Sequence, residues 1–209
     1  MKAPILIFDF DGTIADTHSR MVEISNLLSK EFNYKFIHPQ DVENLRGKTS
    51  QEVIRILNVP ILKIPSIIAK AKRELYRGIN SIAPIHGIKD ILDQLKQREI
   101  KIGILSSNSL ENIIKFLHNH GIHAFDFIHT TPKIWSKNTS LKKLLTKNNF
   151  SHEEVIYVGD EVRDIEAAKK LGVKVAAVTW GYNSAQTLKN LKPDFILYEP
   201  KDLLKLLSS

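Results

Sequence analysis

Short apolar runs alternate along this chain with segments whose apolar residues recur at helical spacing, and this alternation limits the folds open to it. The runs that read as buried strands are residues 5–8, 100–105, 127–128, 155–158, 175–178 and 195–197. The helical patterns lie around residues 88–95, 110–117, 141–145, 165–171 and 203–207. Strands that alternate with helices favour parallel pairing, because each helix carries the chain back to the start of the next strand. The sequence therefore predicts an α/β fold with a doubly wound parallel sheet.

One stretch interrupts the alternation with helical patterns alone. Within it, Thr49 and Glu52 have the spacing of a capping box, and Pro65 suits the first turn of a helix that runs to about Gly78. We therefore expect an inserted α-helical domain at residues 17–80. Residues 1–16 and 81–209 would form the α/β core.

Composition excludes several classes of protein. The 209 residues suffice for one domain with a small insertion, and 43% apolar with 25% charged residues is a usual globular balance. The absence of cysteine excludes disulfides and thiolate chemistry, and it fits a reducing, cytoplasmic location. Asp9 breaks the first apolar stretch, so we expect neither a secretory signal nor a membrane span.

The formal net charge of +7 raises the question of nucleic acid as a partner. The lysines are scattered through helix-like segments and do not form a block, which favours a solvated basic surface or an anionic small substrate. A nucleic-acid-binding module would need a clustered basic face. We therefore expect no nucleic acid and no membrane among the partners, and a monomer or weak homo-oligomer.

Two carboxylates one residue apart follow the first apolar run. Ligands of doubly wound sheets bind at the carboxyl ends of the strands, which is where Asp9 and Asp11 occur. Residues two apart on an extended chain point to the same side, and Gly12 permits a sharp bend. Close carboxylates repel each other unless a cation or a shared proton intervenes, and Mg²⁺ prefers oxygen ligands. An Asp-Gly pair is also typical of a plain turn, so this pair alone does not distinguish a ligand-binding site from a turn.

The string Asp9-Phe10-Asp11-Gly12-Thr13 behind an apolar strand resembles the first motif of the haloacid dehalogenase superfamily, a large group of phosphatases with an aspartate nucleophile. Three further motifs of that family have counterparts here in the expected order. They are Ser106 after a strand, Lys137 before a helix, and the Gly-Asp-Glu-Val-Arg-Asp string at residues 159–164. The helical insertion resembles the family's small cap, and residues 178–182 with 193–194 are similar to the phosphoglycolate phosphatase branch.

The resemblance implies roles for these aspartates. Asp9 would attack phosphorus and form an aspartyl phosphate, and Asp11 would act as general acid and then general base. Mg²⁺ would be held by the Asp9 side chain, the Asp11 main-chain carbonyl and the Asp160 side chain. Asp164 would hold metal-bound water or orient the motif lysine. Taken alone, residues 159–164 also suit an acidic helix start.

The resemblance also implies a phosphate-binding group made by Ser106, the main-chain amides of Ser107 and Asn108, and Lys137. A serine-rich helix cap is the alternative for the first three. Asn138 stands where the family often has proline after its lysine, and Lys133 after Pro132 is a rival for that role.

The remaining implied contacts concern the substrate. Thr13 would support the site or touch phosphate. Arg46 and Lys48, between two expected cap helices, would reach the leaving group of the substrate, although an ordinary polar loop is equally consistent with them.

The expected function is a Mg²⁺-dependent phosphatase that acts on a small phosphorylated metabolite, with phosphoglycolate favoured by the resemblance. A phosphomutase on the same fold would use the same aspartates, and sequence separates the two poorly. A dehalogenase is disfavoured, because attack on a carbon–halogen bond does not need the acid–base group Asp11. A catalytically silent binding protein is disfavoured because all four motif positions are chemically intact.

Overall fold

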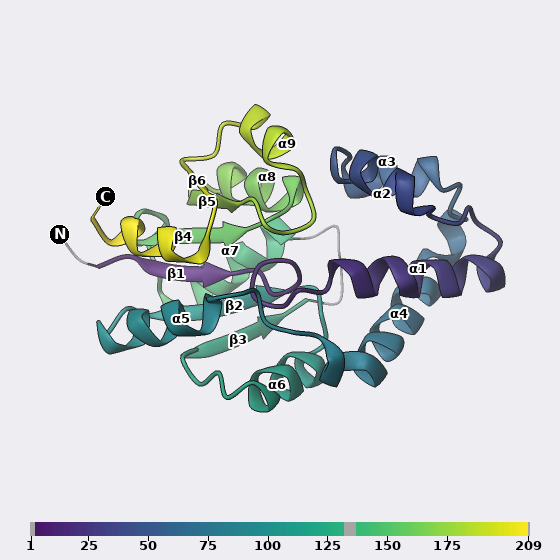
Figure 1. The fold of residues 1–209 in the computed structure, drawn as a ribbon. Coiled ribbons are helices and arrows are strands. Elements are labelled where there is room, and N and C mark those ends of the chain that lie inside the picture. Colours follow the sequence, from purple (N-terminus) through teal and green to yellow (C-terminus); the bar gives the residue numbers. More distant parts are fainter. Residues whose placement is uncertain (1–2, 132–136, 209) are drawn as a thin grey trace.

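A parallel sheet forms the centre of the molecule (Figure 1). The computed structural model describes residues 3–131 and 137–208. In this part of the chain the sheet has six strands in the order β3-β2-β1-β4-β5-β6, and every neighbouring pair is parallel. The strands are β1 (Ile5–Phe8), β2 (Ile102–Ser106), β3 (Phe127–Thr130), β4 (Val155–Gly159), β5 (Lys174–Val178) and β6 (Phe195–Leu197). The predicted doubly wound α/β fold is confirmed.

Helices connect the strands and cover both faces of the sheet (Figure 1). Those of the sheet region are α5 (Ile88–Gln97), α6 (Leu110–Asn119), α7 (Lys137–Asn148), α8 (Val162–Lys170), α9 (Ala185–Asn190) and the 3₁₀ helices η5 (His152–Glu154) and η6 (Pro200–Ser208). The helical insertion contains α1 (His18–Phe32), α2 (Val42–Arg46), α3 (Ser50–Ile56), α4 (Ile64–Gly78) and the 3₁₀ helices η1 (Pro39–Asp41), η2 (Ile61–Lys63) and η3 (Ile79–Ser81).

Strand β1 is buried on both faces, which explains its continuous apolar run. Leu6 and Phe8 point to one face and pack in the cluster that includes residues of α5, α6 and η6. Ile5 and Ile7 point to the other face and pack with residues of α7, α8 and α9. The strand that carries Asp9 at its end is thus held from both sides.

The helical insertion extends from the end of the sheet at which β1 finishes (Figure 1). Helices α1 and α4 pack against each other along this extension. The predicted capping box is present, because the Thr49 side chain accepts from the Glu52 main-chain N–H while the Glu52 carboxylate accepts from the Thr49 main-chain N–H. Pro65 lies in the first turn of α4, as the sequence predicts.

Two local details differ from the sequence-based expectation. Strand β2 begins at Ile102 because Ile100, although buried, closes helix α5 by donating its main-chain N–H to the Leu95 carbonyl at 3.1 Å. Helix α9 is not expected from the sequence, since its six residues carry one fully buried apolar side chain, Leu188. The closing segment at residues 203–207 is helical as predicted, within η6.

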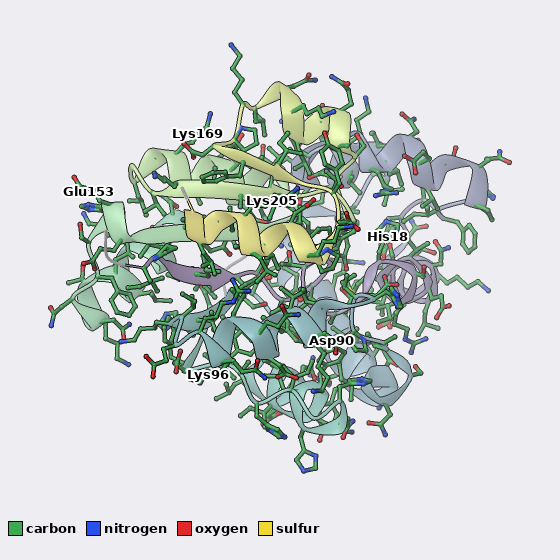
Figure 2. The ribbon with its side chains drawn as sticks, turned by 60° about the vertical axis from the view of Figure 1, so that its left-hand side comes forward. His18, Asp90, Lys96, Glu153, Lys169 and Lys205 are labelled. Atoms are coloured by element: carbon green, nitrogen blue, oxygen red, sulfur yellow. The ribbon has the colours of Figure 1, made fainter. Side chains whose placement is uncertain are left out.

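Lysines of the core lie on separate elements at its periphery, as Figure 2 shows for Lys96, Lys169 and Lys205. Lys96 pairs with Asp126, and Lys205 pairs with Asp202. Lys169 donates to a main-chain carbonyl. These cations therefore have local partners on the surface. Among the described residues, no helix combines the length and the apolar character needed to cross a bilayer.

Replacing Leu92 by alanine should lower the free energy of unfolding by roughly 2 to 5 kcal/mol, because it leaves a cavity under α5. The Leu92 side chain has no exposed surface in the core cluster. Urea denaturation followed by circular dichroism measures the change. Leu62→Ala is the control, since Leu62 is 96% exposed and its truncation should cost less than about 0.5 kcal/mol. Equal effects of the two substitutions would contradict the assigned core.

Candidate active site

The order of the strands reverses between β1 and β4, and the carboxyl ends of these two strands carry acidic residues. Asp9 follows β1 and Asp160 follows β4, and both are buried. The Asp9 main-chain N–H donates to the Val158 carbonyl at 2.8 Å, which extends the pairing of the strands to the site. Ligands of doubly wound sheets bind in the crevice at such a reversal.

A third carboxylate joins this pair. Asp9, Asp160 and Asp164 each offer an oxygen, and these oxygens lie within 4.8 Å of one another. Asp164 is in the first turn of α8, where its Oδ2 accepts from the Glu161 main-chain N–H at 3.0 Å. The helix start therefore fixes the direction of the Asp164 side chain.

Lys137, the first residue of α7, enters this acidic group. Its Nζ lies 2.5 Å from Asp9 Oδ2 and also pairs with Asp164 Oδ1, and the side chain is only 5% exposed. Burial lowers the pKa of the Lys137 ammonium, but the charges of Asp164 and Asp9 outweigh burial and hold it well above its ordinary value. Lys137 is thus a permanently charged partner of Asp9, whereas the rival Lys133 lies outside the described residues.

The donor set suits a divalent cation. Three carboxylates and one ammonium leave a formal charge of two negatives in a buried place. Burial, with the charges of neighbouring carboxylates, raises the pKa of Asp160 well above its ordinary range; burial also raises the pKa of Asp164, to about 6. Those shifts express the cost of crowding negative charge away from water. A hard cation with oxygen ligands would relieve this cost, so the residues fit Mg²⁺.

Asp160 is held by the loop after β1 and by the loop after β5. Thr13 Oγ1 donates to Asp160 Oδ1 at 2.7 Å, and the Tyr182 main-chain N–H donates to Asp160 Oδ2 at 2.7 Å. Gly12 has φ +75°, and a Cβ at this position would lie 2.3 Å from Asp160 Oδ2. The glycine therefore permits both the turn and the close approach of the carboxylate. The Thr13 hydroxyl thus helps to fix the Asp160 carboxylate.

Asp11 is partly buried beside Asn108. The Asn108 side-chain amide lies 3.1 Å from both carboxylate oxygens of Asp11. Burial and the charge of Asp9 raise the pKa of Asp11 to about 7, although hydrogen bonds from Asn108 and Thr17 act in the opposite direction. Asp11 can therefore exist in protonated and ionised forms near neutral pH.

The turn after β2 differs in part from the expectation. The Asn108 main-chain N–H, expected to face a phosphate, donates to Ser106 Oγ at 3.0 Å. This contact leaves the Ser106 hydroxyl proton free to donate elsewhere. Ser107 lies beside the same cavity as Asn108 and Asp11. Ser109 is the residue that caps α6, by accepting from the Asn112 main-chain N–H. The contact of the Asn108 side chain with Asp11 had no signal in the sequence, because the two residues are 97 positions apart.

Arg46 and Lys48 lie at the junction of the helical insertion with the core. The Arg46 guanidinium donates to the Gly181 carbonyl at 2.9 Å and to the Tyr182 carbonyl at 3.3 Å. The Asn183 side-chain amide donates at 2.9 Å to the main-chain carbonyls of Arg46 and Lys48. Arg46 and Lys48 also border the cavity that Asp11 borders.

Known proteins resemble this chain over almost its whole length. The model of the family described as haloacid dehalogenase-like hydrolase matches residues 6–178. A phosphoglycolate phosphatase of Synechococcus elongatus is 36% identical over 201 residues, which are 96% of this chain and 95% of that protein. Pyrophosphatase PpaX of Oceanobacillus iheyensis is 23% identical over 222 residues, with 98% and 96% covered.

Solved structures share the fold. A predicted phosphatase from Clostridium acetobutylicum superposes with a TM-score of 0.85 at 18% identity, and the match covers 100% of both chains. A structure at 18% identity shows only that the fold is shared. The family match and the 36% identical relative show common descent. The chain is therefore an enzyme of the haloacid dehalogenase-like hydrolase family, homologous to phosphoglycolate phosphatase.

Proposed function

We propose that this protein is a Mg²⁺-dependent phosphatase that hydrolyses a small phosphomonoester through an aspartyl phosphate on Asp9. The observation that carries the proposal is the buried group in which Lys137 contacts Asp9 and Asp164 while Asp160 lies alongside. A buried carboxylate, a fixed ammonium and two further carboxylates at one point support this proposal. Phosphoryl transfer depends chiefly on such positioning and charge compensation.

Asp9 is the nucleophile. Its Oδ1 accepts from the Phe10 main-chain N–H at 2.8 Å and its Oδ2 contacts Lys137, so the carboxylate is held from both ends. One of its oxygens attacks phosphorus while the bond from phosphorus to the leaving oxygen breaks. Lys137 contacts Asp9, and Ser106 is the last residue of β2, which pairs with β1, so both residues would stabilise the oxygens of the transferred group.

Asp11 moves the proton in both halves of the reaction. In its protonated form it gives a proton to the leaving oxygen. As a carboxylate it then takes a proton from the water that attacks the aspartyl phosphate, which releases phosphate and restores Asp9. The Asn108 amide keeps the Asp11 side chain in one place for both transfers.

The residues that would hold Mg²⁺ are the side chains of Asp9 and Asp160 and the main-chain carbonyl of Asp11. When bound, the ion compensates the charge of the phosphoryl group and of the carboxylates around it. Asp164 positions Lys137 through their ion pair and completes the acidic group. Thr13 holds Asp160.

Residues 17–80 act as a cap over the core formed by residues 1–16 and 81–209. Contacts of Arg46 and Lys48 with the loop at residues 181–183 support a closed position of this cap. A closed cap excludes water and strengthens each charge interaction inside. The relative at 36% identity is named for phosphoglycolate, which makes that compound the favoured substrate.

Asp9→Asn should reduce the rate of phosphate release from phosphoglycolate by at least about 10³-fold, because the carboxamide cannot attack phosphorus. Purified protein is assayed for free phosphate in Mg²⁺, and circular dichroism checks the fold. Asp16→Asn is the matched control, since Asp16 is exposed a few residues further along the loop and should keep turnover. Turnover by Asp9→Asn at the wild-type rate would exclude Asp9 as the nucleophile.

Removal of divalent ions with a chelator should reduce phosphate release to background, because the buried carboxylates would then repel the substrate. Addition of Mg²⁺ in excess should restore it. The measurement is the rate of phosphate release before chelation, after chelation and after Mg²⁺ is returned. A rate that is unchanged by the chelator would show that the reaction needs no dissociable metal.

Lys137→Ala should reduce turnover by at least about 10²-fold, because it removes the cation that contacts Asp9 in a buried place. Lys133→Ala is the comparison, and it should have a much smaller effect. Both variants are assayed for phosphate release at saturating substrate. A larger loss in Lys133→Ala would transfer the role of the motif lysine to that residue.

A further inference from the structure

Helix α6 of the core carries a polar side chain at a position that has no exposed surface. Asn112 is the third residue of this helix, and the next buried residues, Ile113 and Phe116, are apolar. The side-chain oxygen Oδ1 of Asn112 has no hydrogen-bond partner among the described residues. An apolar side chain would fill such a place at lower cost, because a buried polar atom without a partner gives up its hydrogen bonds to water. A role other than packing would explain an asparagine at this position.

The side-chain NH₂ group of Asn112 has two acceptors. It donates to Asn108 Oδ1 at 2.8 Å and to the main-chain carbonyl of Lys72 at 3.3 Å. Asn108 belongs to the turn between β2 and α6, whereas Lys72 lies in α4 of the helical insertion, which packs against α6. Asn112 is thus a bridge between the core and the insertion, next to the candidate active site.

The contact with Asn112 determines which way the Asn108 amide faces. Asn108 Oδ1 accepts from Asn112 and, at 2.8 Å, from the Ser109 main-chain N–H. Because two donors hold this oxygen, the amide presents its NH₂ group on the other side, 3.1 Å from both carboxylate oxygens of Asp11. A reversed amide would bring its oxygen against the Asp11 carboxylate and its NH₂ group against two donors. The orientation that suits Asp11 therefore depends on the donor supplied by Asn112.

We propose that Asn112 is a positioning residue for the acid–base group Asp11 and that it acts through Asn108. This inference rests on the proposed phosphatase function and adds to it a residue that keeps the Asp11 side chain at the leaving oxygen. Proton transfer requires the donor and the acceptor to lie within hydrogen-bond reach, and a small displacement slows it strongly. Without the Asn112 NH₂ group the Asn108 amide is free to turn, and the Asp11 carboxylate loses its fixed place.

The test compares Asn112→Ala with wild type on two small phosphates that differ in the leaving group. The alcohol of phosphoglycolate needs a proton as it leaves, whereas the acetate of acetyl phosphate leaves as a stable anion. Since kcat/KM covers the steps up to departure of the leaving group, it should fall at least about 10-fold for phosphoglycolate and less than about twofold for acetyl phosphate. Equal losses on the two compounds, or no loss on either, would overturn the proposal.

Asn119→Ala is the matched control. Asn119 lies on the same helix and also donates to the insertion, to Asn80 Oδ1 at 2.8 Å, but this bond is at the surface, so its loss should change neither value. Asn112→Leu is a second variant that fills the space of the amide, and it should show the same selective loss. Circular dichroism and urea denaturation check that each variant is folded.

A double substitution tests whether Asn112 acts through Asn108. Asn108→Ala should itself lower kcat/KM for phosphoglycolate, and Asn112→Ala added to it should lower the value by less than about a further twofold. Losses that multiply would show that Asn112 acts independently of Asn108, in contradiction of the proposal.

A crystal structure of Asn112→Ala protein keeps this test separate from the proposed function. The Asn108 amide should turn or move, and the Asp11 carboxylate should leave its place beside it. Unchanged positions of both side chains would refute the positioning role whatever the activity of the variant. If wild type releases phosphate from neither compound, the phosphatase function fails, and the crystal structure still decides whether Asn112 holds Asp11.

Discussion

The contact of Lys137 with Asp9 and Asp164 is the interaction on which the rest of the site depends. Three carboxylates cannot share a buried space without opposite charge, because each ionised group loses water and repels the others. Lys137 supplies one positive charge from the start of α7, and the remaining negative charge makes the place attractive to a divalent ion. The need for charge balance links four elements, β1, β4, α7 and α8, because each of them provides or positions one of the charged side chains.

The reversal of strand order between β1 and β4 makes this assembly possible. Parallel strands end at the same edge, so the loops that carry Asp9 and Asp160, about 150 residues apart in sequence, meet there. Asp160 connects these loops further, because Thr13 and the Tyr182 main chain both donate to its carboxylate. Gly12 permits the approach, as any side chain there would collide with Asp160. The same contacts that build the acidic group thus hold the surrounding loops.

The helical insertion is attached to the core at two places with different consequences. Near residues 46–48 it is bound by donors and acceptors of the loop at residues 181–183. Along α4 it is bound through Asn112, which also holds Asn108. Because Asn108 contacts Asp11, the position of α4 and that of the Asp11 side chain are coupled. The position of the helical insertion and that of the Asp11 carboxylate therefore depend on the same two amide side chains, Asn108 and Asn112.

Local patterns in the sequence indicated most of the elements, and the resemblance to a known family indicated the acidic group. The apolar run before Asp9 reads as a strand buried on both faces, and the Thr49–Glu52 spacing predicts a helix start, because these features depend on neighbouring residues alone. Helix α9 was not predicted, because six residues with one fully buried side chain are too few to show the helical spacing of apolar residues. The contacts of Asn108 and Asn112 were decided by the tertiary structure. Their partners lie far away in the chain, and no local pattern encodes which polar groups meet once strands and helices pack.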